Sequence, residues 1–506
     1  MYRILFAEKD TYITDRVISG RRVTGANLGR AGTLDLFKLY GVTSSGSVPN
    51  VELSRALIKF DLSDLQAQMS SDGVAVNDPT FSVLLKLSDV YGSQTTPANF
   101  SLVLYPLSRS FDEGTGRDVA YYRDRDTANF LTASWSGGAS VWFASGANGQ
   151  GLLGSANIDI ITSGNIGAGI TQFGVSQSFA LGTEDLLLDI TPLISATIAG
   201  LIPDKGFRIS FVSTEENDTK SRFVKRFGSR SANDPWKRPR LIARWNDSIS
   251  DDRNSMTLDA SGTLFLYNHV PNGLKNLVSG AALTSLTGTN CISLRLETPV
   301  SGGIYTLTFL GSQYTSAPYT SGTYYASVAV PTSIPAIREQ LAASGSVTFT
   351  EIWSSLDGTV PFLSQTLTLK SQDAQTFGLM PMQYVVSLTN VQEEYATDQT
   401  VYLRVFVRKL GVADTSTKVT RLAKSYIPEA VHYSVRDAVT NDVVIPFDES
   451  SNSTKMSSDS LGLRFKLFMD TFVAGRSYAI DVMIKEGDSR TTYRNVGGNF
   501  RVNEPR

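Results

Sequence analysis

The segment Val401-Tyr-Leu-Arg-Val-Phe-Val-Arg408 places a branched or aliphatic residue at every second position, and it decides the fold class. The segment Gln365-Thr-Leu-Thr-Leu-Lys370 has the same period of two. Side chains of a β-strand point alternately to its two faces, so this period predicts strands with one buried face. Shorter apolar runs bounded by Gly, Asn, Asp, Ser or Pro occur at 56–60, 81–87 and 100–105.

Helical patterns are few. Only residues 189–200 and 333–343 predict helices, the second with Pro335 near its first turn. Many short strands with few helices are typical of sandwiches rather than of parallel α/β sheets. We therefore expect an all-β fold, with an N-terminal jelly-roll-like β-sandwich followed by two smaller immunoglobulin-like β-sandwiches.

The chain length and its polar segments predict the domain boundaries. A length of 506 residues suggests about three domains of roughly 100–200 residues. The polar, turn-rich segment 246–255 predicts a linker, and a softer boundary is expected between 371 and 377. The expected domains are residues 1–247, 256–371 and 377–506. Residues 321–330 and 474–483 share a Gly turn, a Tyr and an alternating strand, as immunoglobulin-like sandwiches often do, but whether 256–506 is one domain or two stays open.

Composition narrows the chemistry and the partners. The 46 basic and 48 acidic residues leave a formal charge of −2, which gives no reason to expect nucleic acid or an anionic membrane as a partner. Cys291 is the only cysteine, so an intrachain disulfide and a multi-cysteine zinc site are excluded. His269 and His432 are far apart and have no metal-binding spacing. The sequence contains neither a signal-peptide pattern nor a membrane span, so we expect synthesis in a reducing cytoplasm.

A basic stretch between residues 220 and 244 is the strongest charge asymmetry of the chain. Within it, aromatic and basic residues alternate imperfectly from Arg222 to Phe227, which predicts a strand with some aromatic side chains inward and cations outward. A solvated face that protects a sheet edge is the favoured interpretation, followed by a protein interface and then by DNA phosphates. The candidate interface residues are Arg222, Lys225, Arg226, Arg230, Lys237 and Arg238.

Two tryptophans lie in a Gly/Ser-rich segment, Trp135 and Trp142. Aromatic side chains can stack on sugars, so this pair is a candidate glycan platform. Packing in the core is the favoured interpretation, and an interface anchor is the third.

Catalytic and metal sites are weakly indicated. Asp112 and Glu113 open a charged stretch that ends at Asp126, but the arginines within it favour ionised carboxylates in a solvated loop over a hydrolytic pair. Residues 149–154 match the letters of a dinucleotide motif without its strand–turn–helix context, so we expect a glycine-rich loop. No catalytic residue and no cofactor is expected, although structural calcium stays possible at the oxygen-rich turns 61–64 or 247–252.

Four stretches of the first 245 residues resemble the DNRLRE-type domain, a carbohydrate-binding-module-like β-sandwich of secreted bacterial proteins and phage virion proteins. In chain order these stretches are Asp10-Thr-Tyr-Ile13 with Asn27-Leu-Gly29 and Thr33-Leu-Asp-Leu36, Arg55-Ala-Leu-Ile-Lys-Phe-Asp-Leu62, Leu188-Asp-Ile-Thr-Pro-Leu193 with Gly206-Phe-Arg-Ile-Ser210, and Ser229-Arg-Ser-Ala-Asn-Asp-Pro235 with Arg238-Pro-Arg-Leu241. In that family a tryptophan in the region of Trp135 and Trp142 usually packs in the core. Residues 372–506 more loosely resemble C-terminal immunoglobulin-like domains of tailed-phage structural proteins, notably at 384–390 and 403–408.

The resemblance implies a non-enzymatic structural component of a tailed-phage virion, synthesised in the host bacterial cytoplasm and located in the tail, baseplate or neck. Such a protein would act through contacts with other virion proteins and with copies of itself in the symmetry of the particle. The alternative is a carbohydrate-binding adhesion module that contacts host surface glycans. A polysaccharide-degrading tail enzyme is a third option, but the sequence has no regular repeat of the kind that a long β-helix needs.

Overall fold

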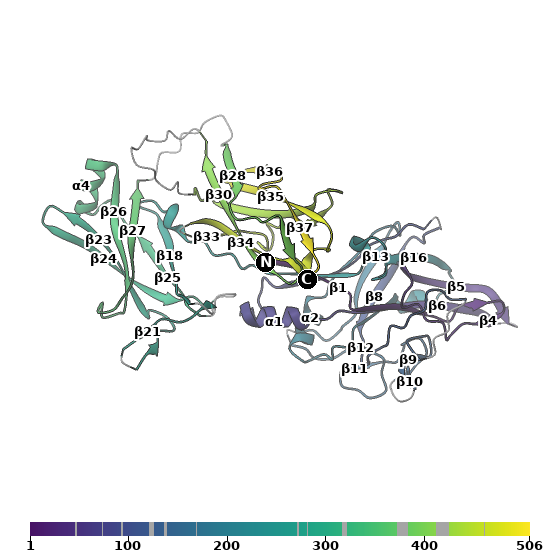
Figure 1. The fold of residues 1–506 in the computed structure, drawn as a ribbon. Coiled ribbons are helices and arrows are strands. Elements are labelled where there is room, and N and C mark those ends of the chain that lie inside the picture. The colour runs from purple at the N-terminus through teal and green to yellow at the C-terminus, as the bar shows by residue number, and fades with distance from the viewer. Residues whose placement is uncertain are drawn as a thin grey trace. The chain divides into compact units, whose positions relative to one another are not determined.

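The computed structural model describes residues 1–45, 48–72, 74–92, 95–120, 126–135, 139–167, 169–270, 273–280, 282–315, 321–371, 383–410, 425–459 and 461–505. The chain divides into two compact units, one of residues 3–67 and 76–244, the other of residues 1–2, 68–75 and 245–506. The first boundary therefore lies at Trp245, close to the expected position. The softer boundary expected at 371–377 falls almost entirely outside the described residues. The all-β prediction is confirmed, because sheets dominate both units (Figure 1).

The N-terminal sandwich contains a seven-stranded sheet of order β13-β8-β15-β6-β5-β16, with β2 on β6, and a four-stranded sheet of order β1-β17-β7-β14. Pairs β9–β10, β11–β12 and β3–β4 complete it. Its strands are β1 (Tyr2–Phe6), β2 (Lys9–Thr14), β3 (Val17–Ile18), β4 (Arg21–Arg22), β5 (Thr33–Ser45), β6 (Val48–Lys59), β7 (Ser82–Leu87), β8 (Phe100–Pro106), β9 (Thr132–Trp135), β10 (Ala139–Val141), β11 (Gln150–Leu152), β12 (Ile160–Ser163), β13 (Val175–Phe179), β14 (Leu186–Asp189), β15 (Phe207–Phe211), β16 (Arg222–Gly228) and β17 (Arg240–Arg244).

The seven-stranded sheet is buried on both faces. Three successive residues of β6, Ala56, Leu57 and Ile58, are all fully buried, which requires cover on each side of the strand. On one side, a separate apolar cluster joins Leu57 and Ile13 to residues from segment 107–160, namely Leu107, Phe111, Ala128, Ala133, Trp142, Ala147 and Ile160. The described residues of segment 107–160 that join this cluster therefore form a packed layer over the sheet.

Three α-helices lie in this part of the chain: α1 (Ser63–Asp72), α2 (Thr191–Ile198) and α3 (Ser213–Glu216), with a 3₁₀ turn at Pro235–Lys237. Helix α2 falls inside the predicted range 189–200. Helix α1 was not predicted, because its apolar residues are too sparse to show a helical period. Its start is nevertheless encoded by Asp61, whose Oδ1 accepts hydrogen bonds from the N–H and the hydroxyl of Ser63.

The middle sandwich has strands in the order β18-β25-β24-β23-β26-β27. Strand β24 pairs with β23 along its length and then with β25 through Ser312 and Gln313, so it passes from one layer to the other. The elements are a 3₁₀ turn at Asp252–Asn254, β18 (Ser261–Tyr267), β19 (His269–Val270), β20 (Gly273–Leu274), β21 (Val278–Ser279), β22 (Thr284–Ser285), β23 (Ile292–Val300), β24 (Gly303–Gln313), β25 (Thr323–Ala329), α4 (Pro335–Ser344), β26 (Ser346–Ser354) and β27 (Pro361–Lys370).

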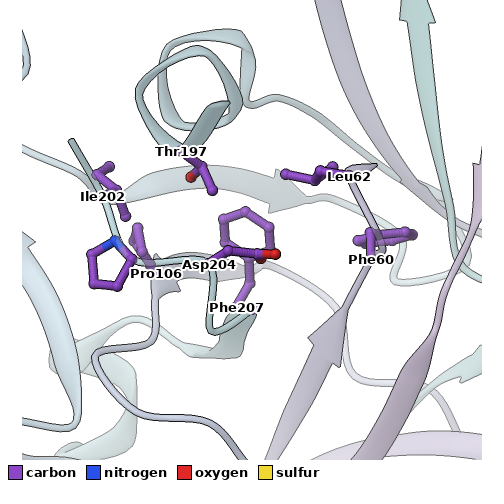
Figure 2. Close-up of a pocket in the computed structure, with 9 residues that line it drawn as sticks. Phe60, Leu62, Pro106, Thr197, Ile202, Asp204 and Phe207 are labelled. Carbon is purple, nitrogen blue, oxygen red and sulfur yellow. The ribbon is translucent and has the colours of Figure 1, made fainter. Parts of the chain in front are cut away.

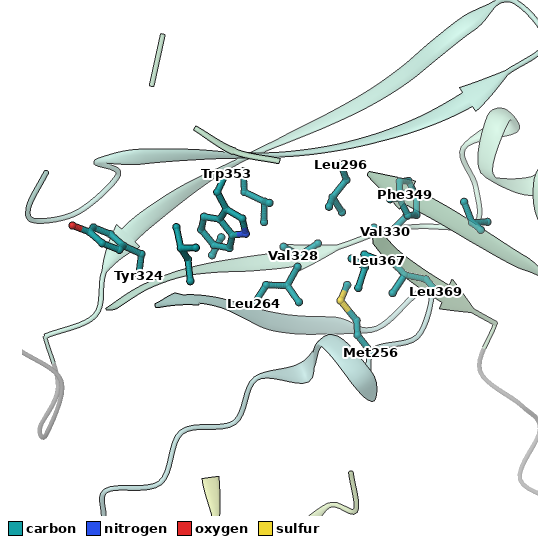
Figure 3. Packing of buried hydrophobic residues seen from close by; sticks show 14 of the residues in the cluster. Met256, Leu264, Leu296, Tyr324, Val328, Val330, Phe349, Trp353, Leu367 and Leu369 are labelled. Carbon is teal, nitrogen blue, oxygen red and sulfur yellow. The ribbon is translucent and has the colours of Figure 1, made fainter. Parts of the chain in front are cut away.

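Alternating side chains of these strands meet in one apolar core. Leu264 and Val328 of one layer lie opposite Phe349, Trp353 and Leu367 of the other (Figure 3). The predicted helix is present as α4. It ends at Gly345, whose φ of 70° provides the left-handed turn that closes many helices.

The C-terminal sandwich has two sheets, of order β28-β30-β34-β33 and β29-β37-β35-β31-β32 with β36 on β35. Tyr433 and Phe465 stack across the two sheets with ring centroids 4.4 Å apart. Its elements are β28 (Tyr384–Leu388), β29 (Glu394–Ala396), β30 (Thr400–Lys409), β31 (Ala430–Asp437), β32 (Val443–Ile445), β33 (Ser457–Asp459), β34 (Gly462–Phe468), a 3₁₀ turn at Met469–Thr471, β35 (Ser477–Glu486), β36 (Ser489–Tyr493) and β37 (Asn499–Asn503).

The two tyrosines that share a sequence pattern have different roles. The Tyr478 hydroxyl donates to the Val473 carbonyl and accepts from the Val473 N–H, which is a tyrosine corner of the immunoglobulin type. The Tyr324 hydroxyl instead donates to Leu286 and accepts from Leu277, far upstream in the chain. Both tyrosines that the pattern marks are buried, but only Tyr478 forms a tyrosine corner.

Segment 246–255 is anchored rather than free. The Ser458 N–H donates to Ile249, and the Asp251 N–H donates to Ser458, so the segment adds a short parallel contact to β33. At its other end Arg253 reaches into the middle sandwich and binds both Glu351 carboxylate oxygens at 2.7 and 3.1 Å. None of the described helices has the length and hydropathy needed to cross a membrane.

Candidate functional site

Two cations of the basic stretch are internal. Lys225 on β16 is fully buried, and its ammonium binds Asp89 and the carbonyls of Gly182 and Glu184. Arg222 is also buried and forms an ion pair of 2.7 Å with Asp218. A partner protein cannot reach either cation, so the predicted interface is wrong for these two residues.

The other four cations of the predicted interface lie closer to the surface. Arg226 pairs with Asp35 on the neighbouring β5 at 3.1 Å, and Arg230, 42% exposed, pairs with Glu113 at 2.6 Å. Lys237 is exposed, and Arg238 donates to the Ala232 carbonyl. These contacts tie β16 and the chain after it to the sandwich. The sequence showed the cations but not the acidic partners, which come from distant segments.

Asp10 and Glu113 both contact Arg230. The Asp10 N–H donates to Glu113, while the Arg230 N–H donates to the Asp10 carboxylate. Burial raises the pKa of Asp10 to about 7. Asp10 is only 1% exposed, so its carboxyl lies inside the fold and cannot contact a substrate that arrives from solvent. Asp112 and Asp118 lie nearby in sequence, but Arg123 to Arg125 fall outside the described residues.

The two tryptophans separate. Trp142 is buried in the cluster over the seven-stranded sheet, and its indole N–H donates to the Asn129 carbonyl at 2.9 Å. It has no open face for a sugar, which corrects the idea of a two-tryptophan platform. Trp135, at the end of β9, is 50% exposed.

Buried arginines fix the segment that follows Trp142. Arg55 forms a two-pronged ion pair with Glu216 and donates to the Gly146 carbonyl at 2.8 Å. Arg208 donates to Ala147 and Asn148 at 3.1 and 3.0 Å, and burial lowers its pKa to about 9. The two guanidinium groups therefore hold the backbone carbonyls of Gly146 and Ala147 and the side chain of Asn148 from the sheet side.

A buried carboxylate fixes the same segment from its other side. Asp159 is fully buried and accepts hydrogen bonds from the N–H groups of Phe143, Ala144 and Gly149 at 2.8–2.9 Å. The path from 143 to 149 is thus set by three charged side chains from distant strands and loops. No sequence pattern indicated these contacts, because Arg55, Arg208 and Asp159 are each unremarkable in their own local sequence.

Exposed apolar side chains are frequent between residues 131 and 152, and we name the five of them the 131–152 surface. Phe143 is the one that stands on the backbone held by these contacts, and it lies against Gly149, the residue before β11. The side chains are 45–59% exposed and belong to Leu131, Trp135, Val141, Phe143 and Leu152. Apolar groups gathered on a rigid scaffold are typical of a contact surface for another molecule.

The cavities offer less to a ligand. In the N-terminal sandwich, a cavity of about 10 Å³ lies between Phe60, Pro106, Thr197, Asp204 and Phe207 (Figure 2). This is room for a single water molecule. Within the other unit, a cavity of about 320 Å³ lies beside Asp252, Glu429 and Lys455, but Asp252 and Glu429 already accept backbone N–H groups.

The expected calcium turns use their carboxylates internally. Asp61 caps α1, while Asp251 and Asp252 bind Arg253 and the Thr263 N–H. Across the described part of the chain, no group of three His, Cys, Asp or Glu side chains is placed to hold a metal ion. His269 is exposed and stacks on Tyr267, His432 and Cys291 are buried, and burial lowers the pKa of His432.

Comparison with known proteins adds little. No family model matches the chain, and no curated protein sequence matches it. Among solved structures the chain is similar to fibronectin(III)-like modules of CbhA from Clostridium thermocellum, with 10% identity over 51% of this chain and 93% of that chain and a TM-score of 0.15. So low a TM-score carries no argument, and the fold rests on the sheets described above.

Proposed function

We propose that this chain is a non-catalytic structural component of a tailed-phage particle, located in its tail, baseplate or neck. It would act by binding other particle proteins and copies of itself. The observation that carries the proposal is the 131–152 surface, with five exposed apolar side chains, among which Phe143 stands on a backbone held by Arg55, Arg208 and Asp159. The resemblance of the first 245 residues to virion β-sandwiches supplies the kind of particle.

A preformed surface suits protein assembly. Exposed aromatic and aliphatic groups become buried when a partner covers them, and such groups dominate the energetics of protein interfaces. Because the backbone at 143–149 is already fixed, little ordering is required on binding. The anchored segment 249–254 suits the same role. It bonds to β33 of the C-terminal sandwich and, through Arg253, to Glu351 of the middle sandwich, and so links the two.

The proposal is tested in purified particles from the host that carries the gene. Mass spectrometry of gradient-purified particles should detect the chain at a fixed copy ratio to known tail proteins. Antibody gold labelling should then mark one position along the particle. Absence of the chain from particles that retain full infectivity would overturn the proposal.

A second candidate is a carbohydrate-binding adhesion module, and the half-exposed indole of Trp135 favours it. An indole face stacks well on a sugar ring, and Phe143 on the same surface adds a second aromatic group. A glycan array probed with the full-length protein separates the two candidates. Binding that disappears in Trp135→Ala would establish the module, whereas absence of binding would exclude it for the glycans tested.

A further inference from the structure

Strand β27 forms a long edge of the middle sandwich. It pairs with β26 over Pro361–Lys370, and the strand order ends there. On its other side, the described residues contribute one contact, from the Leu258 N–H to the carbonyl of Lys370, the last residue of the strand. A strand edge of this kind offers a row of backbone donors and acceptors to another strand.

The opposite edge of the same sandwich is closed. The Thr263 N–H of β18 donates to the Asp252 carboxylate at 2.8 Å, and the Phe265 carbonyl accepts from Arg253 at 2.9 Å. Side chains of the preceding 3₁₀ turn therefore occupy the backbone groups that a further strand would need. One sandwich thus has one protected edge and one open edge.

The contact at Lys370 defines which groups of β27 face outward. Its carbonyl points away from β26, toward Leu258. The N–H and C=O of one strand residue point to the same side, and the side alternates along the strand. The backbone groups of Ser364, Thr366 and Thr368 therefore point outward as well. Their side chains lie on the exposed face of the sheet.

The sequence of β27 does not protect this edge. Natural edge strands commonly carry lysine, other charges, proline or a bulge against unwanted pairing. From Phe362 to Leu369 there is no Asp, Glu, Lys, Arg or Pro, and the single register shift lies at the start of the strand, by Pro361. Leu367 and Leu369 are buried, while the exposed face is hydroxyl-rich. Residues 362–369 are therefore uncharged, and their threonines and phenylalanine favour a strand.

We propose that β27 is an assembly strand, which pairs antiparallel with β27 of a second copy of this chain and so joins two middle sandwiches by a continuous sheet. A second copy is the occupant because the strand is complementary to itself. Pairing centred on Thr366 sets Thr366 opposite its own copy, Ser364 opposite Thr368, and Leu363 opposite Leu369. Hydroxyl then meets hydroxyl on one face. The other face pairs Leu363 with Leu369 and Gln365 with Leu367, and no like charges face each other.

This inference names one contact of the assembly role proposed above and rests on it for its biological setting. One strand pair is a small interface, so we expect a dissociation constant in the micromolar range, as for interfaces below about 1,200 Å². Many copies in one particle would strengthen the contact through avidity.

Sedimentation equilibrium of the full-length chain, from roughly 1 to 200 µM, measures the association. Thr366→Lys places two ammonium groups face to face across the symmetry axis and should weaken association at least about tenfold. The matched control is Thr350→Lys on β26, which is exposed on the same face, opposite Thr366, but away from the edge. It should leave association within about twofold of the unmodified chain.

A charge-swapped mixture sharpens the test. Thr366→Lys and Thr366→Glu should each be monomeric alone and should associate when mixed, because opposite charges then meet across the axis. Hydrogen exchange of the unmodified chain provides a readout without substitution, since β27 amides should gain protection as concentration rises. A monomeric unmodified chain, unchanged β27 exchange, or equal behaviour of Thr366→Lys and Thr350→Lys would overturn the inference. None of these results bears on whether the chain is found in particles.

Discussion

Replacing Arg253 by methionine tests how the middle sandwich is tied to the segment before it. The guanidinium is 8% exposed and binds Glu351, Asp251 and the Phe265 carbonyl. Glu351 and Asp251 are themselves fully buried. Methionine keeps most of the volume of the side chain but removes its charge, so two buried carboxylates lose their shared cation.

The expected loss follows from these contacts. Removing one partner of a buried ion pair costs about 3–5 kcal/mol, because the charge left behind is neither solvated nor paired. The loss should lie near the lower end, about 3 kcal/mol. Burial already raises the pKa of Asp251 to about 6, so this carboxyl can take up a proton when Arg253 is absent. Glu351 also keeps hydrogen bonds from Trp353 and Gln365.

Hydrogen exchange with mass spectrometry on the full chain measures the effect locally. Amides of β18 and β26 should exchange about 100-fold faster in Arg253→Met, since 1.4 kcal/mol is a factor of ten. Peptides from β15 provide an internal reference in the other unit. The control is Arg295→Met in the same sandwich, whose ion pair with Glu297 is 3.8 Å long and partly exposed, and worth about 0–1 kcal/mol. Equal exchange in the two variants would refute the reasoning.

Three further results are expected. The raised pKa of Asp10, about 7 against 3.8 when unfolded, means that the N-terminal sandwich loses stability, by up to about 4 kcal/mol, as pH rises from 4 to 7. Asp10→Asn should remove that slope in urea titrations followed across this range, and an unchanged slope would contradict the assignment. Trp142→Ala should cost about 3–5 kcal/mol in thermal or urea unfolding, whereas Trp135→Ala should stay within about 0.5 kcal/mol and lose partner or glycan binding; similar stabilities for both would contradict their burial. Tyr478→Phe leaves the Val473 N–H and carbonyl without their partner and should cost about 1–3 kcal/mol, seen as faster exchange in β35, while no change would refute the corner.

The sequence predicted what depends on local periodicity. The alternation at 401–408 became β30, and the alternation at 365–370 became part of β27. The two predicted helices are present within a few residues of their expected bounds. These features were accessible because a period of two, or a proline in a first turn, constrains a segment whatever its neighbours are.

Contacts between distant segments were not accessible in this way. Lys225 looked like a surface cation because nothing near it in sequence is acidic, yet Asp89 lies beside it in the fold. For Trp142, core packing was favoured over a glycan platform or an interface anchor, and the buried cluster over β6 decides for the core. The helix at 63–72 was missed for the converse reason, since its local pattern is weak although its cap at Asp61 is clear.

Three charged side chains are buried around segment 143–149, and their role is to fix the path of its backbone. A buried ion pair is seldom more stable than apolar residues of the same volume, because desolvation offsets most of the attraction. Arg55, Arg208 and Asp159 therefore contribute little net stability, but each binds backbone groups that apolar side chains cannot bind. What they supply is one fixed backbone path, and that path sets Phe143 into solvent. Leucines around this segment would give a stable core without fixing this path, whereas a fixed path suits the contact surface proposed above, because little ordering is then required on binding.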